Sequence, residues 1–351
     1  MEINKKSIVL GTIVVICVAL SYIDGAVGFM PTTTPVQVVF NLVLMIAGFM
    51  MLIKGADIFV DAASKIATKF NIPQMVIGLT IVAFGTSLPE AAISIKGAFS
   101  GNAGITVGNV VGSNIMNILL ILGITSCIAA LPIKKNTLKY EMPFVIIVTV
   151  VLLVLGVMGD KLGRIDGIIL LVLLAVFMVY LIKSAKNGEA DDEETVVSEK
   201  DTMLLLLTLV VLGGVCIVLG SNVTVDAASY IAGKCGMDDR LIGLTVVAFG
   251  TSLPELMTST TAARKGKVDI AIGNIVGSNI FNIVFVVGIC SLITPVAFKA
   301  AFVKDTIVAI FAAVLLLVCV IRNKKLAKAG GITMLTVYAA YFAYILYMNY
   351  H

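Results

Sequence analysis

The sequence predicts an all-α membrane protein with ten core transmembrane helices arranged as two inverted five-helix repeats. Of its 351 residues, 59% are hydrophobic and only 13% are charged, whereas soluble domains typically carry about 25% charged residues. Apolar runs of about 17–25 residues, the length that spans a bilayer as a helix, recur along the chain. One stretch of sequence also occurs twice, which predicts that the protein has two related halves.

The N-terminal segment, residues 1–35, is expected to lie outside this core. Lys5 and Lys6 precede an apolar stretch at 8–22. Its length and basic flank suit either a signal peptide or an extra membrane helix, and the small residues at 26–28 could serve as a cleavage site. Both interpretations remain open.

Ten apolar stretches after residue 35 are expected to form the core helices. By hydropathy they cover about 36–63, 74–98, 104–127, 143–159, 165–185, 202–232, 240–263, 268–293, 303–321 and 330–349. The polar, acidic linker 187–201 separates a first repeat, 36–186, from a second, 202–351. The acidic run 191–194 inside the linker is interpreted as part of a solvated connector. Asp61 and Asp226 could either gate the ion path or cap helices, and capping is the favoured interpretation.

The repeated stretch runs from Gly78 to Gly123 and returns from Gly243 to Gly288. The offset is 165 residues with no gap, and 26 of the 46 positions are identical. Each copy contains one glutamate, Glu90 or Glu255, in an otherwise membrane-like stretch. An ionisable group at that depth is costly and therefore marks an ion or proton path by default.

The charged residues of the loops predict how the chain is oriented. When the first apolar stretch is counted as a crossing, seventeen of the 25 Lys and Arg residues fall on one side and seven on the other. Because cytoplasmic loops carry the positive excess, we expect a cell-membrane protein with a cytoplasmic linker and an extracellular C-terminus. The two glutamate helices are then five crossings apart. The two copies therefore face opposite ways, which is typical of secondary transporters.

A proline precedes each glutamate and is expected to loosen the helix. Pro89 and Pro254 have no N–H to offer the carbonyl groups of Gly85 and Gly250 four residues earlier. Broken backbone at membrane depth is tolerated where it lines a cavity or is buried in protein, and freed carbonyls there can coordinate small cations. The nearby side chains all offer oxygen, the ligand that Ca²⁺ and Na⁺ prefer. They are Thr86, Ser87 and Glu90 in the first copy and Thr251, Ser252 and Glu255 in the second.

The second part of each motif reads GNVVGSNIMN or GNIVGSNIFN. Ser113 and Asn117 are four residues apart, so they share one helix face, and the same holds for Ser278 and Asn282. The remaining asparagines fall on other faces, where packing or interhelical hydrogen bonds would satisfy them; they are Asn109, Asn114, Asn274 and Asn279. The glycines of the motif allow close helix approach.

The two glutamates together predict exchange rather than leak. Their combined charge of about −2 is neutralised by one Ca²⁺ or two Na⁺, whereas an empty site would leave carboxylates uncompensated in a low dielectric. A site that is costly to carry empty across the membrane favours an antiporter.

The motif pair GTSLPE and GNxxGSNIxN, present in both halves, resembles the sodium/calcium exchanger family, especially its compact prokaryotic members. The resemblance covers both repeats and implies that the second, third, seventh and eighth core helices enclose cation sites, while the first and sixth slide to switch access. It implies Glu90 and Glu255 as shared ligands of Ca²⁺ and Na⁺. The implied remaining ligands are Thr86, Ser87, Thr251, Ser252, Ser113, Ser278, Asn117, Asn282 and the carbonyls of Ala83 and Ala248. Relatives often have aspartate where Asn117 or Asn282 stands, so potassium co-transport is not expected.

Other functions fit the sequence less well. An H⁺/Ca²⁺ antiporter of the same fold is the nearest alternative, and a passive cation channel is a second, although no ring of carbonyls or acids is readable. No nucleotide-binding loop or intramembrane hydrolase motif is present, and His351 is the only histidine. The six cysteines are scattered singly and read as packing residues. We therefore expect no enzyme activity and no cofactor, and a lipid bilayer, Ca²⁺ and Na⁺ rather than nucleic acid as partners.

Overall fold

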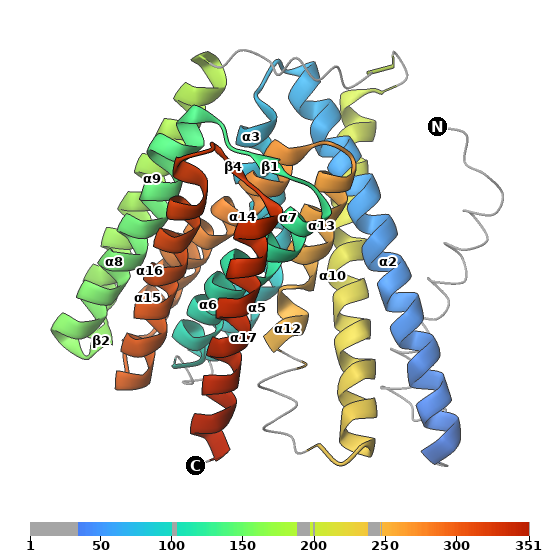
Figure 1. Ribbon diagram of the computed structural model, residues 1–351, viewed down its shortest axis with the longest axis vertical. Helices are drawn as coiled ribbons and strands as arrows, with labels where there is room; N and C mark the ends of the chain where they lie inside the picture. The colour runs from blue at the N-terminus through green and yellow to red at the C-terminus, as the bar shows by residue number, and fades with distance from the viewer. Residues whose placement is uncertain are drawn as a thin grey trace.

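The computed structural model describes residues 34–99, 104–187, 197–198, 201–237, 246 and 248–350. The expected segment at 8–22, the acidic run 191–194 and the start of the helix expected at 240–263 lie outside the described residues. The described chain is a bundle of helices with two short strand pairs (Figure 1). Eight of its helices are long and apolar enough to cross a membrane, and a bent pair makes a ninth if it is counted as one span.

Two long helices, α2 (Thr34–Lys69) and α10 (Met203–Lys234), pack against each other along one edge of the bundle (Figure 1). Helix α2 continues past its expected end at residue 63 because its last turns are anchored. Lys65 Nζ lies 2.9 Å from Asp201 Oδ2, and Lys69 Nζ donates to the Asp201 carbonyl at 2.8 Å. The hydrogen bond from Lys65 lowers the pKa of the Asp201 carboxyl below its ordinary value.

Glycines set the distance between α2 and α10. A Cβ atom on Gly220 would lie 2.8 Å from the Gly48 carbonyl oxygen, and one on Gly213 would lie 3.0 Å from the Gly55 carbonyl oxygen. These two contacts are seven residues apart on each helix, so they lie on the same helix face. Small residues at such positions allow membrane helices to approach closely.

The helix that contains Glu90 is broken where the proline predicted it. Helix α3 (Gln74–Ile77), a π-helical segment η1 (Gly78–Val82) and α4 (Ala83–Thr86) are followed by α5 (Leu88–Phe99). The two parts meet at a bend of 48°. The second copy repeats the break between α12 (Ala248–Thr251) and α13 (Leu253–Arg264).

The centre of the bundle is formed by the helices that follow these breaks. In each copy an α-helix leads into a π-helical turn and then another short α-helix, and the π-helical turns begin at Asn117 and Asn282. In their most apolar 18-residue windows, 72% of the residues are buried in the first of these spans and 83% in the second, compared with 11–33% in the other six straight spans. The segments are α6 (Gly104–Met116), η2 (Asn117–Leu122), α7 (Gly123–Ile128), α14 (Val268–Phe281), η5 (Asn282–Val287) and α15 (Gly288–Ile293).

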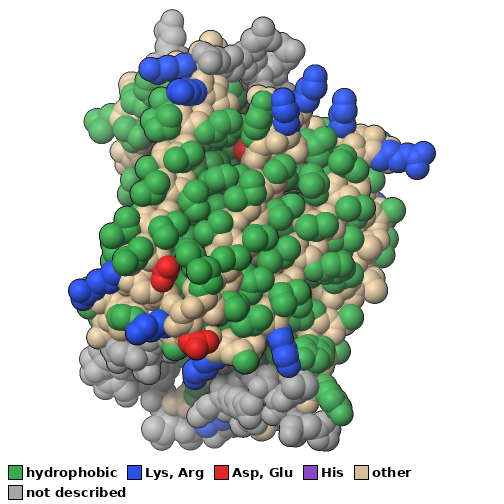
Figure 2. Space-filling view, turned by 90° about the vertical axis from the view of Figure 1, so that its left-hand side faces the viewer, with side chains coloured by type: hydrophobic (Ala, Val, Ile, Leu, Met, Phe, Trp, Pro, Cys, Tyr) green, Lys and Arg blue, Asp and Glu red, His purple; other side chains and the backbone are tan. Residues whose placement is uncertain are grey.

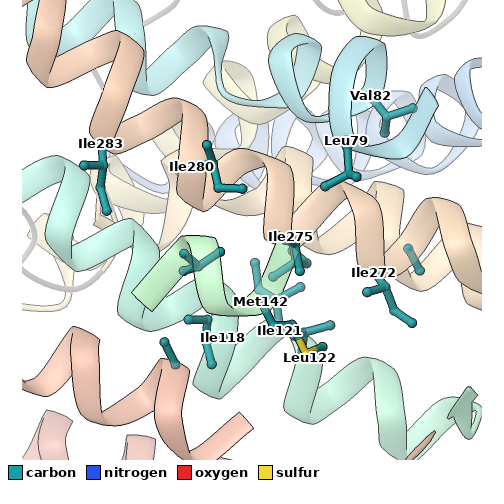
Figure 3. Close-up of a cluster of buried hydrophobic side chains, with 14 of the residues drawn as sticks. Leu79, Val82, Ile118, Ile121, Leu122, Met142, Ile272, Ile275, Ile280 and Ile283 are labelled. Carbon is teal, nitrogen blue, oxygen red and sulfur yellow. The ribbon is translucent and has the colours of Figure 1, made fainter. Parts of the chain in front are cut away.

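Buried aliphatic side chains hold the centre together. Figure 3 shows Leu79 and Val82 of η1 beside α14, whose Ile275 and Ile280 face inward, and Ile118 of η2 close by. All five side chains are buried. Residues from both halves of the chain thus share one hydrophobic core.

Four outer helices cover one side of the centre. They are η3–α8 (Thr137–Glu141, Met142–Gly159), α9 (Arg164–Asn187), α16 (Ala300–Ile321) and α17 (Lys328–Tyr350). The span expected from 143 begins earlier, at Thr137, with a π-helical turn that hydropathy alone does not reveal. Hydrophobic side chains cover the middle of the face in Figure 2, and Lys and Arg gather towards its two ends, as in a membrane-spanning protein.

Two antiparallel strand pairs join the halves. Strand β1 (Leu131–Pro132) pairs with β4 (Lys325–Leu326), and β2 (Lys161–Leu162) pairs with β3 (Val296–Ala297). In Figure 1 the β1–β4 pair lies at the upper part of the bundle and β2 at its lower end. Each pair therefore takes one strand from each half, and the two pairs lie towards opposite ends.

The expectation that Asp61 and Asp226 cap helices is wrong. Asp61 lies inside α2, and its carboxylate contacts Lys265 Nζ at 2.9 Å and Lys267 Nζ at 3.2 Å. Asp226 lies inside α10. Capping requires the unsatisfied N–H groups of a helix start. Helix α2 begins at Thr34 and α10 at Met203, so both aspartates lie many residues beyond the starts of their helices. Asp61 instead ties α2 to the turn between α13 and α14.

Substitution of the crossing glycines tests this packing. Gly213→Ala is expected to destabilise the protein by about 1–3 kcal/mol, because overpacking forces a backbone shift. The measurement is thermal unfolding in detergent. Gly214→Ala is the matched control, since its Cβ would meet only Phe59 at an ordinary 3.7 Å. Equal melting temperatures for the two variants would contradict the close crossing.

Candidate functional site

Glu90 and Glu255 are both completely buried, and each lies in the first turn after a helix break. The break ends at Ser87 in the first copy and at Ser252 in the second, where the backbone adopts φ, ψ values of −83°, 4° and −90°, 3°. These values lie in the bridge region, which active-site residues often occupy. The breaks therefore bring two short helix starts, each with a carboxylate, into the protein interior.

Hydrogen bonds connect the two copies of the motif directly. Ser87 Oγ donates to Glu255 Oε1 at 3.1 Å, and Thr86 Oγ1 donates to Asn274 Oδ1 at 2.9 Å. In return, Ser278 Oγ lies 3.5 Å from Glu255 Oε1 and donates to the Ala83 carbonyl at 3.3 Å. Residues 168 to 195 positions apart in the sequence thus form one buried polar cluster.

Each glutamate has one partnered oxygen and one without a partner. Ser113 Oγ donates to Glu90 Oε1 at 3.4 Å, and Glu255 Oε1 has the partners described above. Glu90 Oε2 and Glu255 Oε2 are buried with no hydrogen-bond partner, as are Asn117 Oδ1 and Asn282 Oδ1. A buried polar atom without a partner is costly. Four such oxygens from four motif positions fit hard cations such as Ca²⁺ and Na⁺.

The backbone at the breaks is less free than the prolines predict. The Gly250 carbonyl, which Pro254 deprives of its helical partner, accepts a 2.7 Å hydrogen bond from Ser221 Oγ of α10. The Ala83 carbonyl accepts from the Ser87 amide at 3.1 Å as well as from Ser278. Sequence reasoning missed Ser221, because no motif links α10 to this turn. Ala248 begins α12.

Two asparagines outside the expected ligand set hold the glutamate backbone. Asn109 Nδ2 donates to the Glu90 carbonyl at 3.1 Å and to Ser94 Oγ at 3.0 Å. In the second copy, Asn274 Nδ2 makes the corresponding bonds, at 3.4 Å to the Glu255 carbonyl and at 2.9 Å to Ser259 Oγ. The expectation of interhelical hydrogen bonds is confirmed. The sequence signal was their shared offset of 165 residues with Ser94 and Ser259.

The two halves of the site differ in detail. Ser87 is bonded to Glu255, whereas the buried hydroxyl of Ser252 has no hydrogen-bond partner. The Ser87 amide donates a hydrogen bond to the carbonyl four residues earlier, whereas the Ser252 amide donates to the Phe249 carbonyl, three residues earlier. Thr86 is buried, and Thr251 is only half-buried. The break is therefore tighter in the second copy.

A mainly apolar cavity of about 960 Å³ lies between α10 and the α4–α5 bend, which is the first break. It also reaches Gly250 and Thr251 at the second break, and among the described residues of its wall only Asp226 is charged. We call it the lateral cavity. Helix α2, which contributes Phe59 to the cavity wall, packs against α13 and is tied to the following turn by the ion pairs of Asp61. The lateral cavity thus borders both helix breaks from the side of α10.

Comparison with known proteins places the chain in one family. The model of the family described as "sodium/calcium exchanger protein" matches residues 40–183 and 205–347. A putative antiporter, CaxA, of Alkalimonas amylolytica is 38% identical over 272 residues, which cover 76% of this chain and 85% of that protein. The sodium/calcium exchanger MaX1 of Methanosarcina acetivorans is 31% identical over 314 residues, which cover 77% and 88% of the two chains.

A solved structure has the same fold. The sodium–calcium exchanger NCX_Mj soaked with 10 mM Na⁺ and no Ca²⁺ superposes with a TM-score of 0.76 at 33% identity, covering 87% of this chain and 99% of that one. The similarity therefore extends over both motif copies and the helices between them. The chain belongs to the sodium/calcium exchanger family.

Proposed function

We propose that this protein is a secondary active antiporter that exchanges Na⁺ for Ca²⁺ by alternating access. One observation carries the proposal: Glu90 and Glu255 are fully buried, Ser87 of the first copy donates to Glu255 of the second, and each carboxylate has an oxygen without a partner. Uncompensated charge in a low dielectric is strongly unfavourable. A bound cation, taken up from either side, would offset that cost.

The oxygen-only donor set supports Ca²⁺ and Na⁺ as substrates rather than resident cofactors. Among the described residues, no group of three or more His, Cys, Asp and Glu could hold a metal, so the cation would depend on two carboxylates together with neutral oxygens. Their charge of about −2 matches one Ca²⁺ or two Na⁺. The proposed ligands are Glu90, Glu255, Thr86, Ser87, Thr251, Ser252, Ser113, Ser278, Asn117, Asn282 and the carbonyls of Ala83 and Ala248.

We also propose that the core is two inverted five-helix repeats, 36–186 and 202–351. The strand pairs support this, because the exchange of the two halves converts the β1–β4 pair into the β3–β2 pair at the other end of the bundle. With the linker 187–201 on the cytoplasmic side, the C-terminus is extracellular.

Coupling to Na⁺ is favoured over coupling to H⁺ by the hydroxyl groups. Thr86, Ser87 and Ser278 place hydroxyl oxygens against Glu255 and the Ala83 carbonyl. A proton that binds a carboxylate needs no such additional ligands, whereas Na⁺ does. Proton-coupled exchange and passive flux remain outcomes of the test described below.

Neutralising either glutamate is expected to reduce Ca²⁺ flux about 100-fold or more, because each carboxylate contributes several kcal/mol to cation binding in a desolvated site. Glu90→Gln and Glu255→Gln are compared in proteoliposomes loaded with Na⁺. Asp305→Asn is the matched control: Asp305 lies within helix α16 and accepts a 3.0 Å hydrogen bond from Tyr341, away from the site. Wild-type flux in both glutamate variants would exclude them as ligands.

The coupling ion is tested by imposing one gradient at a time on proteoliposomes that contain the protein. We expect ⁴⁵Ca²⁺ uptake with an outward Na⁺ gradient and none with an equal pH gradient or with no gradient. Uptake driven only by the pH gradient would assign H⁺ coupling. Flux down the Ca²⁺ gradient alone, insensitive to Na⁺ and pH, would assign a channel.

A further inference from the structure

Four buried asparagines are joined by a continuous set of hydrogen bonds between the two halves of the protein. We call this set the asparagine ring; its members are Asn114, Asn117, Asn279 and Asn282. Asn114 Nδ2 donates to the Asn279 carbonyl at 3.0 Å, and Asn279 Nδ2 donates to the Asn114 carbonyl at 3.3 Å. Asn117 Nδ2 donates to Asn279 Oδ1 at 3.0 Å, and Asn282 Nδ2 donates to Asn114 Oδ1 at 3.1 Å. At most 3% of any of these side chains is exposed.

The orientation of every amide in the ring follows from two backbone groups. A backbone carbonyl can only accept, so the side-chain groups that face the carbonyls of Asn279 and Asn114 must be the NH₂ groups of Asn114 and Asn279. The side-chain oxygens of Asn114 and Asn279 are thereby turned towards Asn282 and Asn117. Asn282 and Asn117 must therefore donate their NH₂ groups to these oxygens.

The remaining oxygens of the ring consequently face away from it. With their NH₂ groups engaged, Asn117 and Asn282 leave Oδ1 buried and without a partner, and the same is true of Glu90 Oε2 and Glu255 Oε2. A ring that served only to join helices would be expected to satisfy all of its buried polar atoms. The two unpartnered amide oxygens therefore point to a ligand.

We propose that Asn114 and Asn279 are positioning residues that fix Asn117 and Asn282 as neutral carbonyl-oxygen ligands of the transported cation. The inference rests on the proposed function and adds two residues outside the expected ligand set. Each positioning residue acts on the opposite half: Asn114 orients Asn282, and Asn279 orients Asn117. Asn117 and Asn282 are also the first residues of the π-helical turns η2 and η5.

The ring also determines which residues fit at positions 117 and 282. Asn114 Oδ1 and Asn279 Oδ1 each require a donor at about 3 Å. An ionised aspartate at 117 or 282 would instead place oxygen against oxygen, because a carboxylate only accepts. In this chain, neutral asparagines at both positions therefore satisfy these oxygens as donors, and the two glutamates remain the source of the site's negative charge.

Double-mutant cycles test the positioning role. Asn282→Ala and Asn114→Ala are each expected to raise the KM for Ca²⁺ about tenfold, the effect of about 1.4 kcal/mol. If Asn114 acts through Asn282, the double variant has the KM of Asn282→Ala alone, because interacting sites are non-additive. The symmetry-related cycle, Asn279 with Asn117, is expected to behave in the same way and provides an independent measurement if one variant does not fold.

The control cycle combines Asn114→Ala with Asn117→Ala, which have no hydrogen bond to each other in the ring, and its effects on KM are expected to multiply. Multiplying effects in the Asn114–Asn282 and Asn279–Asn117 cycles, or an unchanged KM in Asn114→Ala, would overturn the proposal and leave only a structural role. Thermal stabilisation by Ca²⁺ or Na⁺ is measured in parallel. If the unsubstituted protein itself shows neither Ca²⁺ flux nor thermal stabilisation by Ca²⁺ or Na⁺, the proposed function is refuted instead.

Discussion

The fold depends on the burial of two carboxylates in one place. Glu90 and Glu255 have no exposed surface, and removal of an ionised carboxylate from water costs several kcal/mol even after relaxation. The protein meets part of this cost with hydroxyl donors from Ser87, Ser113 and Ser278. It leaves one oxygen of each carboxylate unsatisfied. Under the proposed function, a bound cation would make up this deficit, and the stability of the site would then depend on its being loaded.

The helix breaks and π-helical turns serve this arrangement. In a continuous helix, the backbone groups of the middle turns are all hydrogen-bonded within the helix. A break creates a new helix start, and here it places that start and its carboxylate towards the centre of the protein. The prolines supply the breaks, and Asn109 and Asn274 hold the broken ends by the glutamate carbonyls. Wider turns of the π type, which often occur at functional sites, then begin at Asn117 and Asn282.

Two nearly identical motifs adopt different local structures in this molecule. The break after Thr251 is tighter than the break after Thr86, and the lateral cavity borders both. The long helices also differ, because α2 is ion-paired to Lys265 and Lys267 in the turn after α13, whereas positions 100 and 102 of the first half are Ser and Asn. The two copies have the same residues at the breaks, so the difference between the breaks themselves is one of conformation rather than of local sequence. The glycine crossing of α2 and α10 keeps these helices together while their neighbours differ.

The sequence by itself determined the membrane class, the extent of most helices, the repeat that makes Glu90 and Glu255 equivalent, and the oxygen-only chemistry of the motif. These follow from hydropathy and from a repeat whose spacing is fixed along the chain. Only the tertiary structure decided which groups meet across the halves: Ser221 on the Gly250 carbonyl, Asp61 on Lys265, and the asparagine ring. Helical periodicity assigns a residue to a face but does not say what packs against that face. Contacts between elements distant in sequence therefore require the folded structure.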